Sequence, residues 1–439
     1  MFSELIKRHK MSIAFLGDIL VFALSMAAVL FVRYGNAGFV DQFYIHLKPF
    51  IVVLVLWLII FYISNLYTHK AFGNIIEIAR RVTTAMLVSF SITITIFYIF
   101  SRFFELTPKA NLVVFAMIFG ILDIAWRYAQ KKLFIQKKYR SNILMLASSP
   151  LTKEIDDYIS ANPQLGYAVF PFNIDVLRLK ETLQKNSISQ VVIDGRFLRN
   201  NAVTKLLYSI LSRRIEITTL TDFYEFLFDC VPLAEIEEEW FIREITKNKR
   251  IYESTKYLLE MLLIFVTLPV TILLALVVGI SVKISSPGPV IYKQERVGRN
   301  NRPFTLYKFR TMKTGVEGPL WTTENDSRLT FVGRFLRHTH LDEMPQLLNV
   351  IKREISFIGP RPERTKLAKV YEVIPYYEIR HIIKPGIIGW AQLNFKPSTS
   401  LEEAKKKFQF DLYYIKNRSL ILDLFILLKT ARTLFVGNR

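Results

Sequence analysis

The sequence contains one cysteine, Cys230, and only six histidines among its 439 residues. A single cysteine excludes an intramolecular disulfide and a thiolate metal cluster, which fits a reducing environment for the soluble parts of the chain. A cleavable signal peptide is missing too, because the first apolar run continues to about Val32 without a small-residue cleavage site behind a short core. We expect this run to be a membrane anchor.

A glycine-rich turn is missing where a dinucleotide-binding fold needs one. Over residues 141–245 short apolar runs alternate with helix-like stretches, which predicts a Rossmann-like α/β domain. The runs include Ile143–Ala147, Gln190–Asp194 and Ile215–Thr219. After the first of them, Ala147 to Pro150 contain no glycine that would let backbone amides approach a pyrophosphate. We interpret this domain as a structural or assembly module, with a homodimer interface as a reasonable use.

Apolar residues and positive charge are plentiful. Hydrophobic residues make up 51% of the chain, the mean hydropathy is +0.27, and the net charge is +21. Such charge calls for an anionic partner, which is nucleic acid, phospholipid headgroups or a phosphorylated substrate. The apolar content favours the last two, so we expect no nucleic-acid partner. Part of the charge needs no ligand, because cytoplasmic loops of membrane proteins collect Lys and Arg.

Four apolar runs precede residue 130, each near the ~20 residues that cross a bilayer. They are Ser12–Val32, Phe50–Tyr67, Val82–Phe100 and Ala110–Arg127. Basic residues precede the first run, lie between the second and third, and follow the fourth: Lys7, Arg8, Lys10, Lys70, Arg80, Arg81, Arg127, Lys131, Lys132, Lys137, Lys138 and Arg140. Residues 1–140 are therefore predicted to form a four-helix membrane bundle with both ends in the cytoplasm.

A fifth apolar run, Tyr257–Val282, contains Pro269 near its middle. A proline inside a helix removes one hydrogen bond and bends the axis. If the run crossed the membrane, the dense basic stretch after it would face outward, against the charge bias of the first four runs. A re-entrant helix over about residues 257–284 fits better, and an ordinary kinked transmembrane helix is the alternative that its length permits.

Two adjacent carboxylates, Asp342 and Glu343, follow a basic run at the start of a predicted short helix. Neighbouring side chains on a helix diverge by about 100°, so the two cannot serve one atom in the same way. One can attack phosphorus while the other holds a metal or orients a proton. On its own an Asp-Glu pair is usually a solvated helix start.

The surrounding segments make the pair a site hypothesis. Lys308–Met312 and Gly359–Arg364 place guanidinium groups, which bind phosphate in a bidentate manner, on stiff backbone. Pro385–Gln392 adds glycines that let backbone approach a ligand closely, with Gln392 as a polar contact. Each segment alone is weak evidence for a phosphate-binding site, because Gly-Pro-Arg-Pro and Pro-Gly sequences commonly form turns.

Six motifs in order carry a family resemblance. They are Ser286–Val290, Gln294–Gly298, Tyr307–Met312, Leu341–Gln346, Ile358–Glu363 and Pro385–Ile387. From about Tyr252 to the C-terminus the chain resembles the monotopic polyprenyl-phosphate phosphoglycosyl transferases of the bacterial sugar transferase family. The upstream bundle and α/β domain look like those of its large members, which start exopolysaccharide or O-antigen assembly. Residues 246–439 are then a mixed, mainly α catalytic domain with a re-entrant helix broken at Pro269.

The resemblance implies a reaction and a place for it. Asp342 would attack the sugar-bearing phosphorus of a UDP-sugar and release UMP, and undecaprenyl phosphate would then take the phosphosugar. Glu343 would complete the dyad, and both carboxylates would hold Mg²⁺. The catalytic domain would lie on the cytoplasmic face of the bacterial inner membrane. Candidate substrate and phosphate contacts are Lys308, Arg310, Arg337, Arg361, Glu363, Arg364 and Gln392.

The sequence departs from the family pattern at two positions. His340 stands where members usually carry a small polar residue, and Leu268 precedes Pro269 where many have Ser. The first departure bears on protonation at the site, and the second leaves the helix break to proline alone. Neither removes a residue that the mechanism needs.

Three other readings remain open at this point. His338, His340 and Asp342 also resemble the opening of a His-x-His-x-Asp-His metal motif, although the remaining ligands are too few for a dinuclear zinc site. A membrane-anchored sugar-nucleotide dehydratase or epimerase shares the architecture but needs the missing glycine-rich turn. A non-enzymatic membrane scaffold needs no Asp-Glu pair. The sequence does not identify the transferred sugar, because the contacts to the sugar depend on the loop Lys313–Arg328 and on the region near Gln392.

Overall fold

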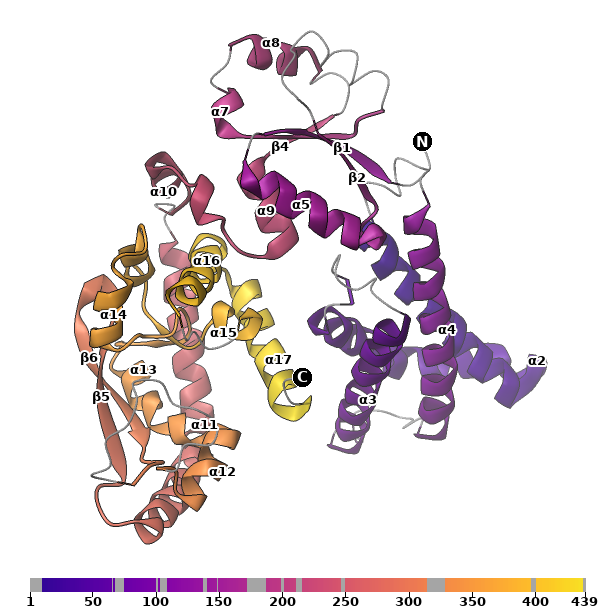
Figure 1. The fold of residues 1–439 in the computed structure, drawn as a ribbon. Helices are drawn as coiled ribbons and strands as arrows, with labels where there is room; N and C mark the ends of the chain where they lie inside the picture. The colour runs from indigo at the N-terminus through magenta and orange to yellow at the C-terminus, as the bar shows by residue number, and fades with distance from the viewer. Residues whose placement is uncertain are drawn as a thin grey trace. The chain divides into compact units, whose positions relative to one another are not determined.

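The computed structural model describes residues 10–64, 66–67, 75–99, 102, 109–136, 140–147, 149–171, 187–198, 201–210, 215–245, 249–313, 328–395 and 400–436. The chain forms two compact units, Met1–Phe223 and Tyr224–Arg439 (Figure 1). The first unit contains apolar helices and a parallel sheet. The second contains one long apolar helix, short strands and many short helices.

Three apolar helices begin the first unit: α2 (Lys10–Ile63), α3 (Ile75–Ile99) and α4 (Lys109–Ile135). The first two predicted helices lie in α2 on either side of a break at Gly35, where φ is 65° and ψ is −172°. The second helix begins directly after this break, earlier in the sequence than predicted. Contacts of Phe22 with Phe50 and of Phe15 with Tyr67 show that the two halves of α2 run antiparallel. Four helical segments therefore form the bundle, as expected.

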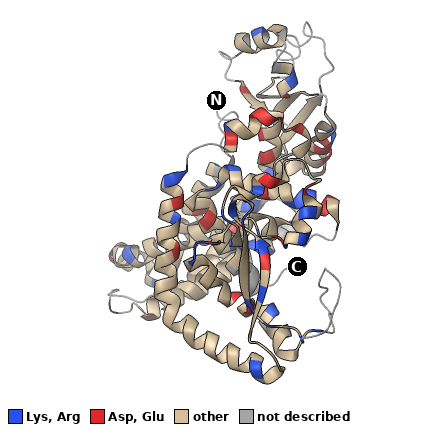
Figure 2. Ribbon diagram, turned by 90° about the vertical axis from the view of Figure 1, so that its left-hand side faces the viewer, with Lys and Arg blue, Asp and Glu red and all other residues tan. Residues whose placement is uncertain are grey.

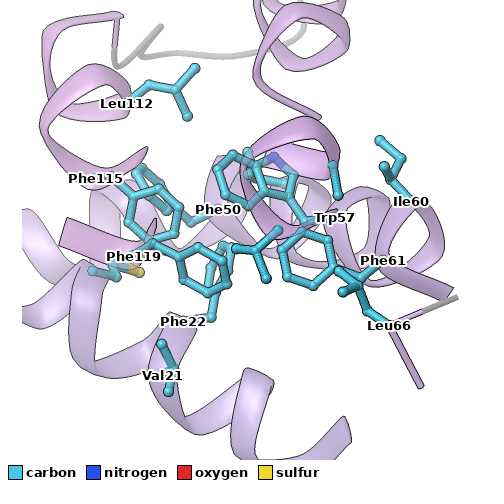
Figure 3. Packing of buried hydrophobic residues seen from close by; sticks show 14 of the residues in the cluster. Val21, Phe22, Phe50, Trp57, Ile60, Phe61, Leu66, Leu112, Phe115 and Phe119 are labelled. Carbon is cyan, nitrogen blue, oxygen red and sulfur yellow. The ribbon is translucent and has the colours of Figure 1, made fainter. Parts of the chain in front are cut away.

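Large aromatic side chains fill the interior of this bundle (Figure 3). Phe22, Trp57, Phe115 and Phe119 gather from α2 and α4, with Trp57 and Phe119 ring centroids 5.2 Å apart. The outer faces are also apolar, as at Leu16, which is 62% exposed. A helix that is apolar on all sides suits a lipid environment, and all three helices are long and apolar enough to cross a membrane.

One buried arginine ties the bundle together. Arg127 on α4 forms ion pairs with Asp18 on α2 and with Asp123 one turn earlier, and it donates to the Leu66 carbonyl at 2.9 Å. All three charged side chains are at most 1% exposed. Charged residues within a membrane bundle are tolerated when they face its interior and pair with one another.

The parallel sheet of the first unit has the strand order β2-β1-β3-β4. Its strands are β1 (Ser141–Leu146), β2 (Tyr167–Pro171), β3 (Gln190–Ile193) and β4 (Glu216–Thr219). Strands β1, β3 and β4 confirm the predicted apolar runs. The helices are α5 (Pro150–Ala161), η4 (Pro163–Leu165), α7 (Gly195–Leu198), α8 (Asn201–Ile210) and α9 (Leu220–Phe228), the last of which continues into the second unit.

The start of α5 is where a dinucleotide-binding fold would hold a pyrophosphate. Here the Ser149 hydroxyl accepts a hydrogen bond from the Leu151 amide at 3.2 Å. Pro150 occupies the first turn and has no amide hydrogen to donate. The N-terminus of α5 therefore offers a phosphate fewer donors than a glycine-rich turn does, and the role of this domain as a structural module stays a prediction.

The second unit is built around helix α11 (Arg250–Ser285). The preceding helices are η6 (Leu233–Glu235) and α10 (Glu238–Ile245), and the hairpin of β5 (Ile291–Val297), η7 (Arg299–Asn301) and β6 (Pro303–Phe309) follows. In the antiparallel register Ile291 pairs with Phe309 and Tyr292 with Lys308. Beyond the hairpin come α12 (Phe331–Thr339), η8 (Leu341–Gln346), α13 (Leu347–Ile351), β7 (Ser356–Ile358), α14 (Thr365–Tyr371), η9 (Tyr377–His381), β8 (Gly386–Ile388), α15 (Trp390–Asn394), α16 (Leu401–Asn417) and α17 (Leu420–Val436).

Helix α11 packs on the rest of this unit at a few positions before and after Pro269. Ile264 meets Leu306 and Ile355, while Val278 and Val282 meet Phe309 and Leu336. The opposite face is apolar and exposed, and no charged residue lies between Glu260 and Lys283, so this stretch is tan in Figure 2. Pro269 lies inside the helix, and the ribbon changes direction along its course (Figure 2).

Helices α16 and α17 lie at the C-terminal end of the second unit. Asp423 on α17 accepts a hydrogen bond from Tyr252 on α11 at 2.8 Å and one from Tyr414 on α16 at 2.8 Å. Ile426 is fully buried, whereas Ile421 is 72% exposed. Helix α17 therefore packs on the domain with one face and leaves part of its apolar surface uncovered.

Candidate active site

The acidic pair lies at a sharp turn between two helices. Helix α12 ends at His340, whose φ of 58° is in the left-handed region, and η8 begins directly after it. This turn brings the start of η8 against β6, the strand that carries Lys308. Asp342 is buried, with 7% of its surface exposed. The pair is thus held in a protected position beside a strand.

Glu343 binds two cations from distant parts of the sequence. Its Oε1 accepts hydrogen bonds from Lys308 Nζ at 2.6 Å and from Arg361 Nη2 at 2.7 Å. Burial alone would raise the pKa of this carboxyl, but Arg361 and Lys308 together hold the pKa of Glu343 far below its ordinary value. Glu343 is therefore a permanent anion that fixes Lys308 and Arg361 in place.

Asp342 has a different environment from its neighbour. Burial raises the pKa of Asp342, Lys308 lowers it, and the negative charge of Glu343 raises it again, so its pKa stands above the ordinary value. Arg337 and His340 also act on Asp342, each lowering its pKa. Within the described part of the chain, the carboxylate of Asp342 accepts no hydrogen bond. A more basic carboxylate that no donor occupies is suited to nucleophilic attack.

The loop that carries Arg361 is held by close backbone packing. Parallel strands β7 and β8 pair Ser356 with Gly386, and a Cβ atom at Gly386 would lie 2.1 Å from the Gly359 nitrogen. Arg361 donates to the Ile387 carbonyl at 3.3 Å, and its own carbonyl accepts from Arg380 at 3.1 Å. The glycines of the Gly-Pro-Arg-Pro and Pro-Gly motifs therefore position the Arg361 side chain.

Several predicted contacts lie away from the acidic pair. The guanidinium of Arg310 is buried and donates to the carbonyls of Ser286 at 2.6 Å and Pro287 at 2.9 Å, so it stabilises the turn after α11. The side chain of Gln392 accepts from the Gly389 amide at 2.7 Å and caps α15. Arg310 and Gln392 thus bind backbone groups, and we do not assign them to phosphate binding.

Glu363 and Arg364 follow Arg361 but have other surroundings. Glu363 accepts from Lys407 at 2.7 Å and lies 3.6 Å from Arg380, within a buried network that includes Asp411. Arg364 precedes α14, and its backbone bridges that of Arg296. Arg337 is nearer to the pair, since it donates to Thr311 Oγ1 at 3.0 Å and lowers the pKa of Asp342. Lys308, Arg337 and Arg361 are thus the predicted cations that the structure brings to Asp342.

Two supporting features were not found from the sequence. Asn349 donates to the Thr305 carbonyl at 2.7 Å and accepts from the Tyr307 amide at 3.2 Å, which ties α13 to the strand that carries Lys308. Arg380 donates to Asp411 at 2.7 Å behind the Arg361 loop. Neither residue lies in a recognisable motif, so the sequence held no signal for them.

The zinc interpretation finds no support in the geometry. His338 and His340 are exposed, whereas Asp342 is buried. Among the residues that the structure describes, no group of three or more His, Cys, Asp or Glu side chains converges on one point. The loop over residues 314–327, where sugar contacts were expected, lies outside the described residues.

Comparison with known proteins assigns most of the second unit to a protein family. Residues 251–437 match the bacterial sugar transferase family, and this range contains the acidic pair and every residue that contacts it. The exopolysaccharide production protein PSS of Rhizobium leguminosarum bv. phaseoli is 38% identical over 180 residues, which are 38% of this chain and 90% of that protein. The chain belongs to the bacterial sugar transferase family.

Other relatives in the family are longer. UDP-N-acetylgalactosamine-undecaprenyl-phosphate N-acetylgalactosaminephosphotransferase of Aeromonas hydrophila is 42% identical over 190 residues, 43% of this chain and 45% of that protein. UDP-glucose:undecaprenyl-phosphate glucose-1-phosphate transferase of Xanthomonas campestris pv. campestris is 32% identical over 310 residues, 63% of each chain. The matches thus span about half to two thirds of these relatives, and the second extends beyond the family domain.

Proposed function

We propose that this chain transfers a sugar 1-phosphate from a UDP-sugar to undecaprenyl phosphate, with Asp342 as the nucleophile. The observation that carries the proposal is the unequal environment of two adjacent carboxylates. Glu343 is neutralised by Lys308 and Arg361, while Asp342 is buried beside the same cations with a raised pKa. The names of the relatives from Aeromonas and Xanthomonas support the substrate class.

The reaction consists of two displacements at one phosphorus atom. An Asp342 carboxylate oxygen bonds to the sugar-bearing phosphorus, the bond from that phosphorus to the bridging oxygen breaks, and UMP leaves with the electron pair. A phosphate oxygen of undecaprenyl phosphate then attacks the same phosphorus and releases Asp342. Lys308 and Arg361 stabilise the charge on the non-bridging oxygens, because phosphoryl transfer depends on fixed positive charge and positioning.

The acidic pair also fits Mg²⁺. This ion usually takes one or two protein carboxylates and completes its octahedral shell with water and substrate phosphates. Asp342 and Glu343 supply two such carboxylates, and the bound ion would neutralise the diphosphate of the sugar nucleotide. With one oxygen of Glu343 already shared by Lys308 and Arg361, Asp342 and the remaining oxygen of Glu343 are the donors that we assign to the ion.

The acceptor lipid requires the site to lie at a membrane surface. Helix α11 is 36 residues long, and the 22 residues between Glu260 and Lys283 carry no charge. At 1.5 Å per residue this stretch is about 33 Å long, close to a bilayer core of roughly 30 Å. The domain packs on this helix on both sides of Pro269, at Ile264 before it and at Val282 after it. A helix that crossed the bilayer would separate these contacts, so we infer a re-entrant helix that bends at Pro269.

The inferred re-entrant position of α11 also predicts where in the cell the reaction takes place. With both ends of α11 on the cytoplasmic face of the inner membrane, the dyad meets cytoplasmic sugar nucleotides and the headgroup of the acceptor. The apolar helices of the first unit would anchor the chain in the same membrane. The product, undecaprenyl-diphosphate sugar, would begin the assembly of a surface polysaccharide such as an exopolysaccharide or O-antigen.

The test is to incubate the full chain with a panel of UDP-sugars, undecaprenyl phosphate and Mg²⁺ and to identify the nucleotide released. UMP is expected, with turnover falling at least about a thousandfold in Asp342→Asn because a nucleophile is lost. The exposed Asp157→Asn is the matched control and should keep full activity. Release of UDP would contradict the proposal, and so would a fully active Asp342→Asn variant.

A further inference from the structure

A cavity of about 570 Å³ lies beside the first turns of α11, apart from the acidic pair. Its lining includes Tyr257 and Leu258 of α11, Arg353 after α13, and Lys384 before β8. None of the residues that contact Glu343 lines it. The proposed transfer reaction makes no use of this cavity.

Two cations of the cavity lie against one aromatic ring. The Arg353 guanidinium carbon is 4.1 Å from the centroid of the Tyr257 ring, and Lys384 Nζ is 5.6 Å from the same centroid. A cation over an aromatic face is stabilised by the ring quadrupole, which orients the side chain without neutralising its charge. Tyr257 therefore orients both cations, and the ring itself does not neutralise them.

The acidic residues of the cavity form their hydrogen bonds and ion pairs with groups other than Arg353 and Lys384. Glu260 accepts from the Ser356 hydroxyl and from the Phe357 amide. Glu253 lies 3.6 Å from Arg418 and 3.9 Å from Arg299. Among the described residues, neither Arg353 nor Lys384 has a carboxylate within ion-pair distance. The cavity thus keeps an excess of positive charge that the protein itself does not balance.

The mouth of the cavity borders the apolar surface of α11. Leu258 lines the cavity and is 66% exposed, and Leu262, one turn further along, is 59% exposed. Arg353 is itself exposed and occupies the left-handed region with a φ of 62°, which an arginine rarely adopts. Arg353 and Lys384, which have no ion-pair partner among the described residues, thus lie where the apolar part of α11 begins.

We propose that this cavity binds the phosphodiester headgroup of an anionic bilayer phospholipid, with Arg353 and Lys384 on the phosphate and the acyl chains along Leu258 and Leu262. Lys and Arg side chains at a membrane surface attract anionic lipids, and a guanidinium matches phosphate geometry. The bound lipid fixes the depth at which the first turns of α11 meet the membrane. This assignment rests on the membrane placement of α11 and not on the transfer reaction.

The test is native mass spectrometry of the full chain with phosphatidylglycerol, phosphatidylcholine or undecaprenyl phosphate, and with inorganic phosphate alone. No UDP-sugar is present, so the result is independent of turnover. The wild-type chain is expected to retain one phosphatidylglycerol molecule in preference to phosphatidylcholine. The double variant Arg353→Ala, Lys384→Gln should lower this retention about tenfold or more, since two headgroup contacts are lost.

The matched control is the double variant Lys366→Ala, Lys369→Ala, which removes two exposed positive charges from α14 and should retain the lipid. Far-ultraviolet circular dichroism and the thermal midpoint of every variant show that the protein is folded. Equal lipid retention by the cavity variant and the wild type would overturn the proposal, as would an equal loss in the control. Selective loss of undecaprenyl phosphate would assign the cavity to the acceptor instead, and tight binding of inorganic phosphate alone would exclude a lipid requirement.

Discussion

Individual carboxylates in the second unit acquire their properties from the cations that surround them. Glu343, which is 13% exposed, and Glu363, which is buried, are both paired with cations. Asp342 lies next to a paired acid and is itself unpaired within the described residues. The presence of a carboxylate alone therefore does not decide whether an acidic residue acts as a nucleophile or as a partner that fixes cations in place. The division of labour that the sequence suggested for Asp342 and Glu343 has a physical basis in these contacts.

Glu363 allows this argument to be tested as a function of pH. Burial opposes its charge, but Lys407 and Arg380 lower its pKa from 4.5 to about 2. A lowered pKa means that its contribution to the free energy of unfolding is complete above about pH 4.5 and is lost as the pH falls toward 2. Glu363→Gln should remove about 3 kcal/mol at pH 7 and little at pH 2.

Denaturant unfolding followed by tryptophan fluorescence would measure this difference at both pH values. The exposed Glu372→Gln serves as the control and should have little effect at either pH. An equal loss for Glu363→Gln at pH 7 and pH 2 would show that its ion pairs contribute nothing to stability.

The sequence identified the acidic pair, Lys308 and Arg361 because each lies in a motif with a recognisable residue pattern. It could not separate Lys308 from Arg310, which are two positions apart and would share a face if the strand continued. Strand β6 ends at Phe309, and the chain then directs Arg310 to the carbonyls after α11. The network of Arg380 and Asp411 depends on contacts over 31 residues, for which no local signal exists.

At the scale of elements, strands β7 and β8 set the position of the Arg361 loop. A Cβ atom at Gly386 would lie 2.1 Å from the Gly359 nitrogen, which backbone cannot accommodate without moving. Gly386→Ala should therefore destabilise the domain by about 1–3 kcal/mol and reduce turnover by displacing Arg361. Gly279→Ala is the matched control, because its nearest neighbour would be 3.6 Å away.

The measurement is the thermal midpoint of each variant together with its rate of UMP release. The Gly279 variant should resemble the wild type or be slightly more stable, since alanine favours helix. If Gly386→Ala behaved in the same way, the close packing of the two strands would have no part in positioning Arg361.

The topology of α11 can be tested by cysteine labelling in sealed vesicles. Cys230 is buried, so a Cys230→Ser background can carry single cysteines at the exposed Glu239, before the helix, and Arg302, after it. A re-entrant helix predicts that both react with an impermeant maleimide from the cytoplasmic side. Asp41→Cys, beside the break of α2, is the control and should react only from the opposite side.

Labelling of Arg302→Cys from the side of Asp41→Cys would establish an ordinary transmembrane helix instead.

The sequence predicted the apolar run of α11 but not its full length. Polar residues at its first turns are helical because they pack on the domain, as Lys256 does by donating to the Ile358 carbonyl at 2.7 Å. The helical structure of residues 36–49 was not predicted, because polar residues such as Asn36, Asp41 and Lys48 separate the two apolar runs in the sequence.

At the scale of the whole chain, every hydrogen bond and ion pair of the Asp342 and Glu343 side chains among the described residues lies within the second unit. The family match over residues 251–437 falls inside the same unit, and a relative from Rhizobium is aligned over 90% of its own length. A fragment of residues 224–439 should therefore release UMP from a UDP-sugar at a rate within about tenfold of the full chain. Assay of the purified fragment in detergent checks this, and an inactive but folded fragment would show that the first unit contributes to chemistry.

The central claim is that Asp342 takes up the phosphosugar. The most direct measurement is intact and peptide mass spectrometry after brief exposure of the full chain to a UDP-sugar and Mg²⁺, with undecaprenyl phosphate left out. The account predicts one sugar phosphate bound to the peptide that contains Asp342, an equal amount of UMP, and loss of the adduct when undecaprenyl phosphate is added. UMP release without any adduct at Asp342, or an adduct on another residue, would contradict it.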